Sequence, residues 1–325
     1  MLLPSWLTHL AYQERSTAWR PWLDVLSKGY RLIRYDPRGC GLSDRTVADL
    51  SFEAWVADLG LLLDRLELRR VSLVGICQGG AVAIAYAGAH PDRIDRLVLF
   101  GSYARGRNRR SAPPMEPDKA RVMLEMLRLG WGDADSAFMR AFATQFQPDG
   151  GLDHLASWCD LQRRATSPAN AVALTRIMFD IDVSDMARRI ANPTLILHPE
   201  RDAVAPIEEG RLLARLIPDA RFLPLDSANH FPLPSEPAWA QVVAALADFL
   251  PTAPDPGTLP NLSAREREVL TLVAQGLDNH AIGAALGISE KTVRNHVTVL
   301  FDKLGVSTRA AAVATARDAG LGAPV

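Results

Sequence analysis

Apolar residues along the chain alternate between short continuous runs and stripes with helical spacing. Strands are predicted for the short runs, which are Leu2–Leu10, Tyr30–Tyr35, Val71–Val74, Leu97–Phe100 and Thr194–Leu197. Helices are predicted for the stripes, which are Trp19, Trp22, Leu23 and Leu26; then Phe52, Trp55, Val56, Leu59, Leu62, Leu63 and Leu66; and the Ala-rich Ala81–Ala89. Ser51 is the expected N-cap of the second helix. Strands that alternate with helices of this length predict a parallel sheet covered on both faces.

The strand pattern disappears between residues 105 and 190. Helices are predicted there over Met115–Trp131, Ala137–Phe146 and Leu152–Arg164, with a further helical stretch on to Arg189. An all-helical insertion between two strands predicts a lid over the carboxyl edge of the sheet, where such folds bind ligands. Large apolar lid residues are candidates to line a pocket, although each is also expected to hold the lid helices together: Met123, Met126, Trp131, Phe138, Phe142, Trp158 and Met178.

A Gly-rich turn joins the Val71–Val74 run to the Ala-rich helix. It reads Gly75-Ile76-Cys77-Gln78-Gly79, a nucleophile between two glycines on a sharp strand-to-helix turn. The N-terminus of the following helix favours an anion, so it favours a thiolate at Cys77. The alternative is a structural cysteine on a glycine-rich turn.

Two later turns complete a catalytic set with Cys77. Asp202 follows the Thr194–Leu197 run, and His230 follows the segment beginning at Arg221. His230 would take the thiol proton and return one to the leaving group, while Asp202 would fix the tautomer of the imidazole. An oxyanion would lie against the backbone N–H of Gln78 and a second donor after the first strand, at Leu10 or Ala11.

The remaining histidines of this region are interpreted as structural, and no metal or other cofactor is predicted. None of the histidines at 9, 90, 154 and 198 has a second histidine at the i, i+4 spacing of a helical metal site. His198 is expected to face away from the reacting atoms.

Residues 251–260 contain four prolines and predict a stiff, extended linker between a first domain (1–250) and a second (261–325). The second domain begins with a capping box at Ser263-Ala-Arg-Glu266. Asp278 and Ser289 are the expected N-caps of the next two helices, which Gly287 separates, and a fourth helix is expected from Arg309 to Ala319. Two helices joined by a short glycine turn predict a helix-turn-helix.

The third helix of this domain, Glu290–Leu304, carries polar side chains on its outward face. Arg294 is suited to a guanine and Asn295 to an adenine in the major groove, and Thr298 lies on the same ridge. Lys291, Thr292 and Lys303 are expected to contact phosphates. Residues 261–325 hold seven basic and six acidic residues, so charge alone does not distinguish this surface from an ordinary solvated helix face.

Composition excludes several classes of protein. At 325 residues, with 48% apolar and 22% charged residues and a net charge of −1, the chain is typical of a two-domain globular protein. The three cysteines (Cys40, Cys77 and Cys159) form no C-x-x-C pair, which argues against a disulfide framework or structural zinc. The first ten residues make a poor signal peptide and no apolar run is long enough to span a membrane, so a cytoplasmic location without membrane contact is expected.

Residues 1–250 resemble a lidded α/β-hydrolase. The matching motifs are D-P-R-G-C-G-L-S-D at 36–44, the G-I-C-Q-G-G elbow, the loop with Asp202, and S-A-N-H at 227–230. The resemblance implies that Cys77, Asp202 and His230 are nucleophile, acid and base. Cysteine replaces the usual serine, His9-Leu10 stands for the usual His-Gly, and the first two strands are absent. The last departure places Leu2–Leu10 near a sheet edge and would also follow from a misplaced start codon.

Residues 261–325 closely resemble the LuxR-type DNA-binding domain. The motifs are L-S-A-R-E-R-E-V-L at 262–270, I-S-E-K-T-V-R-N-H-V at 288–297 and K-L-G-V-S-T-R at 303–309. The resemblance implies a four-helix domain whose third helix enters the major groove of double-stranded DNA and whose fourth commonly forms a homodimer.

Three functions fit these features. The first, which we favour, is a transcription regulator whose hydrolase-like domain senses a small apolar ester, lactone or acyl ligand. The second is a working cysteine hydrolase that is tethered to DNA. The third is a redox sensor in which Cys77 is oxidised reversibly to a sulfenic acid.

Overall fold

A computed structural model of the protein describes residues 1–5, 8–110, 117–133, 136–250, 259, 262–306 and 308–322. The chain divides into a larger unit, Met1–Lys28 with Leu32–Leu250, and a smaller unit at the C-terminal end. The linker predicted at 251–260 lies outside the described residues, apart from Leu259.

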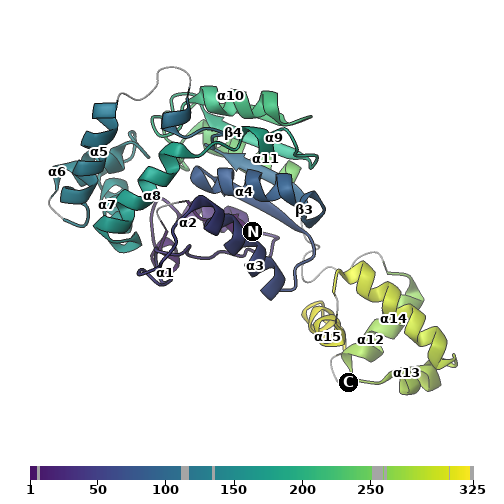
Figure 1. The fold of residues 1–325 in the computed structure, drawn as a ribbon. Helices are drawn as coiled ribbons and strands as arrows, with labels where there is room; N and C mark the ends of the chain where they lie inside the picture. Colours follow the sequence, from purple (N-terminus) through teal and green to yellow (C-terminus); the bar gives the residue numbers. More distant parts are fainter. Residues whose placement is uncertain are drawn as a thin grey trace. The chain divides into compact units, whose positions relative to one another are not determined.

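The larger unit is built on a parallel sheet of five strands in the order β1-β2-β3-β4-β5 (Figure 1). The strands are β1 (Leu2–Leu3), β2 (Val71–Ile76), β3 (Ile94–Phe100), β4 (Thr194–Pro199) and β5 (Arg221–Leu225). In the register, Val74 lies opposite Leu2 on one side and Val98 on the other. The predicted parallel sheet is therefore confirmed.

Two predicted strands differ from the structure at the edge of this sheet. The first ends at Leu3 instead of Leu10, because Pro4 has no N–H for the ladder and His9 already caps a helix, α1 (Leu10–Gln13). The segment 30–35 is not a strand; a Leu2 N–H donates to Ile33 O over 2.9 Å, but no ladder forms. An edge position supplies too few partners to hold these residues as strands.

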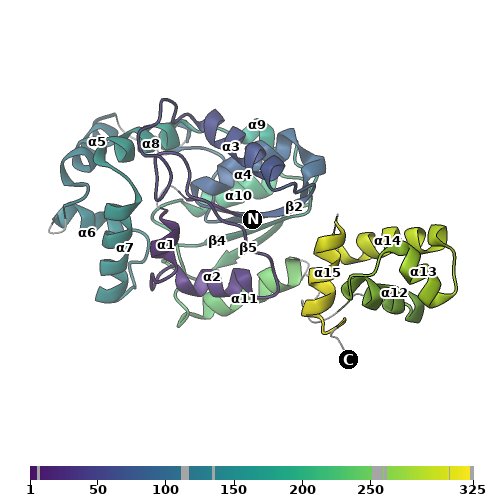
Figure 2. The same cartoon turned by 90° about the horizontal axis from the view of Figure 1, so that it is seen from below.

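Helices cover both faces of the sheet (Figure 2). One face carries α2 (Arg20–Ser27) and α11 (Pro237–Phe249), and the other carries α3 (Phe52–Arg65), α4 (Gln78–Ala89), α9 (Ser184–Ala187) and α10 (Ile207–Leu216). On the first face Trp22 packs edge-on against Phe100 and Trp239. On the second, Ser51 accepts the Ala54 N–H and caps α3 as predicted.

The region between β3 and β4 is helical, as predicted. Its elements are the 3₁₀ helix η2 (Arg107–Arg109), α5 (Pro117–Gly130), α6 (Ala137–Thr144), α7 (Leu152–Ala165), α8 (Pro168–Asp180) and then α9. Within the described part of this region, the one β interaction is an isolated antiparallel bridge between Arg105 and Asp182. Another 3₁₀ helix, η1 (Pro91–Arg93), precedes β3. Helices α5 to α8 lie together at one end of the unit (Figure 1) and form the lid.

The smaller unit is a bundle of four helices, α12 (Ala264–Ala274), α13 (Asn279–Leu286), α14 (Glu290–Leu304) and α15 (Arg309–Asp318). The capping box of Ser263 and Glu266 is formed, and Gly287 takes a left-handed conformation at φ 64° between α13 and α14. Its core consists mainly of aliphatic side chains, including Val269, Leu270, Val273, Ile282, Val293, Val297 and Leu300. The predicted helix-turn-helix is confirmed.

Within the described residues, none of the helices combines the length and the apolar character needed to cross a lipid bilayer.

Candidate active site and nucleic-acid interface

Cys77 occupies a strained turn between β2 and α4. It has φ 53° and ψ −122°, a backbone conformation that a residue with a side chain adopts only where its surroundings enforce it. The surroundings do so in two ways. Its N–H donates to Phe100 O over 2.9 Å, and a Cβ on Gly75 would lie 2.6 Å from the Cα of Gly80, so this approach requires glycine. The turn thus places the sulfur at the N-terminus of α4.

Asp202 and His230 form a buried pair at the carboxyl edge of the sheet. His230 Nδ1 lies 2.6 Å from Asp202 Oδ2, and both side chains are fully buried. The other carboxylate oxygen, Oδ1, accepts the N–H groups of Val204 and Ala205 at 2.7 and 3.1 Å. The carboxylate is therefore fixed by its own loop, and it fixes the imidazole in the tautomer that presents Nε2 for proton transfer.

Nε2 of His230 is available to exchange a proton with Cys77. It makes no hydrogen bond of good geometry with any described residue. Burial by itself would lower the pKa of His230, but the nearby Asp202 and Cys77 charges and the hydrogen bond to Asp202 raise that pKa to about 10. The site is therefore built to hold an imidazolium beside the sulfur.

The two oxyanion donors predicted from the sequence differ in the structure. The Gln78 N–H is the first amide of α4 and has no partner within the helix, so it remains suitable. The Leu10 N–H, by contrast, donates to both carboxylate oxygens of Asp36 at 3.1 Å, and Ala11 is exposed while Cys77 is buried. The prediction of Leu10 as a donor is therefore wrong in this structure.

The segment directly after β1 lies closer to the turn. A Cβ on Gly79 would come within 2.9 Å of Pro4 O and 3.0 Å of Leu3 O. The first strand was predicted to reach Leu10, whereas β1 ends at Leu3, seven residues earlier.

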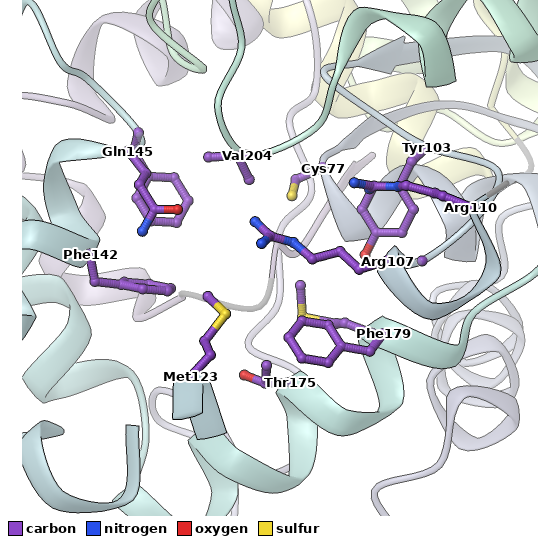
Figure 3. A pocket seen from close by; sticks show the side chains of 13 residues that line it. Cys77, Tyr103, Arg107, Arg110, Met123, Phe142, Gln145, Thr175, Phe179 and Val204 are labelled. Carbon is purple, nitrogen blue, oxygen red and sulfur yellow. The ribbon is translucent and has the colours of Figure 1, made fainter. Parts of the chain in front are cut away.

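A cavity of about 50 Å³ lies between the sheet and the lid, and Cys77 lines it (Figure 3). Of the apolar lid residues proposed as lining, Met123, Phe142 and Met178 do so. Trp158 instead stacks on Phe146 with ring centroids 4.7 Å apart. The other proposed residues (Met126, Trp131 and Phe138) are also outside the lining.

The outward face of α14 presents the residues that the sequence assigned to DNA. Lys291, Thr292, Arg294, Asn295 and Thr298 are all exposed, and the apolar residues between them are buried in the bundle. Arg294 pairs with Glu290 at 3.1 Å across one helical turn, an exposed pair that a stronger partner can replace. The face is thus open to a major groove.

Lys303 differs from these residues. Its Nζ donates to Glu266 Oε2 over 2.7 Å, and this bond together with the Ser263 N–H lowers the pKa of Glu266. Glu266 also closes the capping box of α12. Lys303 therefore ties α14 to α12, which the sequence could not indicate because the two residues are 37 positions apart.

Comparison with known proteins identifies both units. A family model described as alpha/beta hydrolase fold matches residues 2–138, and one described as bacterial regulatory proteins, luxR family, matches residues 260–316. The 2-hydroxy-6-oxo-2,4-heptadienoate hydrolase of Pseudomonas putida is 31% identical over 238 residues, which cover 66% of this chain and 78% of that enzyme. The chain belongs to the α/β-hydrolase family. Its C-terminal end carries a LuxR-family helix-turn-helix domain.

Other hydrolases are similar to the same part of the chain. The 2-hydroxymuconate semialdehyde hydrolase of Pseudomonas sp. strain CF600 is 30% identical over 260 residues, covering 73% of this chain and 83% of that one. The crystal structure of the enol-lactonase from Burkholderia xenovorans is 26% identical with a TM-score of 0.59, covering 76% of this chain and 89% of that one. These matches support the predicted α/β-hydrolase fold.

The hydrolase domain contains site residues that sequence reasoning missed. Gly101, directly after β3, has φ 50° and packs against the ring of His230. His198, which the sequence predicts to be structural and to face away from the reacting atoms, bonds through Nε2 to Ala205 O at 2.8 Å and lies 3.9 Å from Asp202 Oδ2. Burial lowers the pKa of His198, so it packs behind the carboxylate as a neutral ring. No motif marks these residues; only their approach in the fold does.

The other two cysteines of the hydrolase domain are poor nucleophiles. Burial and the nearby Asp36 raise the pKa of Cys40 to about 12, and burial also raises the pKa of Cys159. Among the described residues, no cluster of three or more His, Cys, Asp or Glu side chains is placed to hold a metal ion. Cys77 is thus the thiol with a dedicated base.

Proposed function

We propose that this protein is a transcription regulator whose hydrolase domain binds a small, mainly apolar ester, lactone or acyl compound beside Cys77 and thereby alters DNA binding. The observation that carries the proposal is the pairing, on one chain, of a lidded cavity lined by Cys77 and an exposed α14 face of the LuxR family. The similarity to an enol-lactonase and to other hydrolases supports the ligand class.

The residues at the cavity suit acyl transfer to sulfur. The Cys77 thiol would first pass its proton to His230 Nε2, which gives a thiolate–imidazolium pair, and Cys77 Sγ would then attack the ester carbonyl as the thiolate. Collapse of the intermediate would expel the alkoxide, which takes the proton from His230 and leaves as the alcohol, so that a thioester remains on Cys77. Asp202 would steady the imidazolium throughout, and the Gln78 N–H would stabilise the oxyanion.

The size of the cavity supports a link between ligand and lid. At about 50 Å³ it is far smaller than the roughly 300–1,000 Å³ of ordinary ligand pockets. A ligand would therefore bind a more open arrangement of α5, α6 and α8. Because a ligand shifts an equilibrium only through unequal affinity for two states, this difference in lid position is the element that binding would bias.

We further expect a homodimer on double-stranded DNA, in the cytoplasm, with no membrane partner. Two recognition helices on one duplex impose a fixed spacing between half-sites. A change in the hydrolase domain that alters this spacing would alter the affinity for DNA.

The test measures binding of labelled duplexes from a randomised pool to the full-length protein, at low and physiological ionic strength, with and without p-nitrophenyl butyrate. We expect selection of a consensus duplex and a change of its affinity when the ester is present. Arg294→Ala controls for the DNA contact. Failure of the full-length protein to bind any duplex even at low ionic strength would overturn the proposal.

The buried Asp202–His230 pair favours a second candidate, a working cysteine hydrolase tethered to DNA. Multiple turnovers of p-nitrophenyl butyrate that disappear in Cys77→Ala, without any effect of the ester on DNA affinity, would favour this alternative. A change of DNA affinity caused by peroxide alone, and lost in Cys77→Ser, would instead favour the redox sensor.

A further inference from the structure

Two arginines project into the otherwise apolar cavity beside Cys77. Arg107 and Arg110 both line it, and Figure 3 shows the Arg107 guanidinium reaching between Cys77 and Met123. Among the described residues the lining contains neither Asp nor Glu, and much of it is apolar, including Met123, Phe142 and Met178. An apolar ligand alone gives these cations nothing to bind.

The carboxylate of Glu209 is already paired with a third arginine, Arg105. Glu209 accepts the Arg105 N–H at 3.0 Å and Nη2 of the same residue at 2.9 Å, and its side chain is 2% exposed. Arg110 is held by its own Nε–H, which donates to Arg105 O at 3.1 Å, and its guanidinium lies 5.6 Å from the Tyr103 ring centre. Within the described residues, Arg107 makes no hydrogen bond or ion pair through its side chain.

This arrangement is costly without a ligand. Arg107 is half-buried, and a guanidinium that is partly withdrawn from water and left unpaired loses hydration without compensation. Burial and the Arg110 charge accordingly lower the pKa of Arg107. The buried Tyr103 hydroxyl, which also lines the cavity, lacks a hydrogen-bond partner among the described residues.

We propose that Arg107, with Arg110 and the Tyr103 hydroxyl, forms a carboxylate-binding subsite, so that the ligand of this domain carries a carboxylate as well as an apolar chain. A guanidinium binds a carboxylate through two parallel N–H donors, and the Tyr103 O–H can supply a third bond. The chain would lie between Met123, Phe142 and Met178. This inference rests on the proposed function for its ligand site and narrows the ligand class to anionic amphiphiles.

The carboxylate would also relieve the charge repulsion within the site. The two guanidinium groups repel each other when no anion is present, and an anion between them replaces this repulsion by two attractions. Binding would therefore draw η2 toward the ligand.

The test compares binding of hexanoate with that of hexanamide, which has the same shape without the charge, by tryptophan fluorescence or calorimetry on the full-length protein in the absence of DNA. We expect hexanoate to bind at least tenfold more tightly. Arg107→Gln should bring the two affinities together. Arg109→Gln is the matched control, because Arg109 lies in the same 3₁₀ helix but is exposed and donates to Asp180 O, and it should keep the difference.

Equal affinities of the wild-type protein for hexanoate and hexanamide would overturn the subsite. An Arg107→Gln variant that keeps the preference for hexanoate would also overturn it. If Arg107→Gln changes only the rate of Cys77 alkylation, Arg107 affects the reactivity of the thiol and does not bind a carboxylate. None of these measurements involves DNA, so a failure of the subsite can be distinguished from a failure of the proposed function as a regulator.

Discussion

Gly101 leaves the space in which the His230 ring lies. A Cβ at Gly101 would stand 2.7 Å from Cε1 and 3.0 Å from Nδ1 of His230, and 3.4 Å from Asp202 Oδ2. Its backbone φ of 50° also favours glycine. The end of β3 therefore forms one wall of the catalytic pair.

Gly101→Ala is expected to lower the free energy of unfolding by about 2–4 kcal/mol, since it adds crowding of a buried ring to backbone strain. Urea unfolding measures this loss. Gly132→Ala is the control, because Gly132 also has a positive φ (91°) but nothing lies within 4 Å of its Cβ position. We expect it to cost only about 1–2 kcal/mol. Equal losses in both variants would contradict the packing of Gly101 on His230.

The raised pKa of His230 predicts a stability that falls on the alkaline side. The stabilisation is fully present below the ordinary histidine pKa of about 6.5 and is lost as the pH rises toward about 10. Asp202→Asn removes the charge and should flatten this fall by more than about 1 kcal/mol. Urea unfolding from pH 6 to 10 measures it, and the exposed His90→Gln serves as control. An unchanged slope in both Asp202→Asn and His230→Gln would contradict the assignment.

Cys77 is expected to be the thiol that reacts first with p-nitrophenyl butyrate. Its competitors Cys40 and Cys159 have raised pKa values, mainly because both are withdrawn from water. Intact-protein mass spectrometry should detect a butyryl adduct that Cys77→Ala abolishes and that His230→Gln slows at least tenfold. An adduct that persists marks a covalent sensor, whereas rapid release marks a hydrolase. Labelling of Cys159 at the same rate would contradict the prediction.

Arg294→Ala should relax discrimination at one base pair and cost about 1–3 kcal/mol of binding to the selected duplex. The reason is that Arg294 lies exposed on the outward face of α14, and its ion pair with the exposed Glu290 can be exchanged for a contact with a base. Competition between matched and mismatched duplexes measures the effect. Arg267→Ala, an exposed position on α12, should leave discrimination unchanged. If both variants lose affinity uniformly for all duplexes, Arg294 does not read a base.

Substitutions at Lys291 and Lys303 are expected to differ: the first should lower the affinity for DNA, and the second the stability of the C-terminal domain. Lys291→Ala removes an exposed cation of α14, so it should weaken all duplexes alike and reduce the salt dependence of binding by about one counterion. Lys303→Ala breaks the bond to Glu266, so it should lower the melting temperature of the C-terminal domain while base discrimination is kept. Salt titration and thermal melting distinguish the two. If Lys303→Ala lowers the salt dependence of DNA binding and leaves the melting temperature unchanged, Lys303 contacts a phosphate, as the sequence predicts.

The sequence by itself determined the order of strands and helices, the elbow around Cys77, and the caps and face of α14. These features depend on residues close together in the chain, whose periodicity and turn chemistry are visible as a pattern. It failed at the sheet edge, where segments 4–10 and 30–35 lack the partners that make a strand.

Only the tertiary structure decided which groups meet. In the structure the Leu10 N–H donates to Asp36 and the Lys303 ammonium donates to Glu266. Gly101 packs against the ring of His230. The structure also turns Arg107, which no motif distinguishes, into the cavity beside Cys77. Such contacts join residues tens of positions apart, so they depend on how the elements pack and not on the local pattern that the sequence displays.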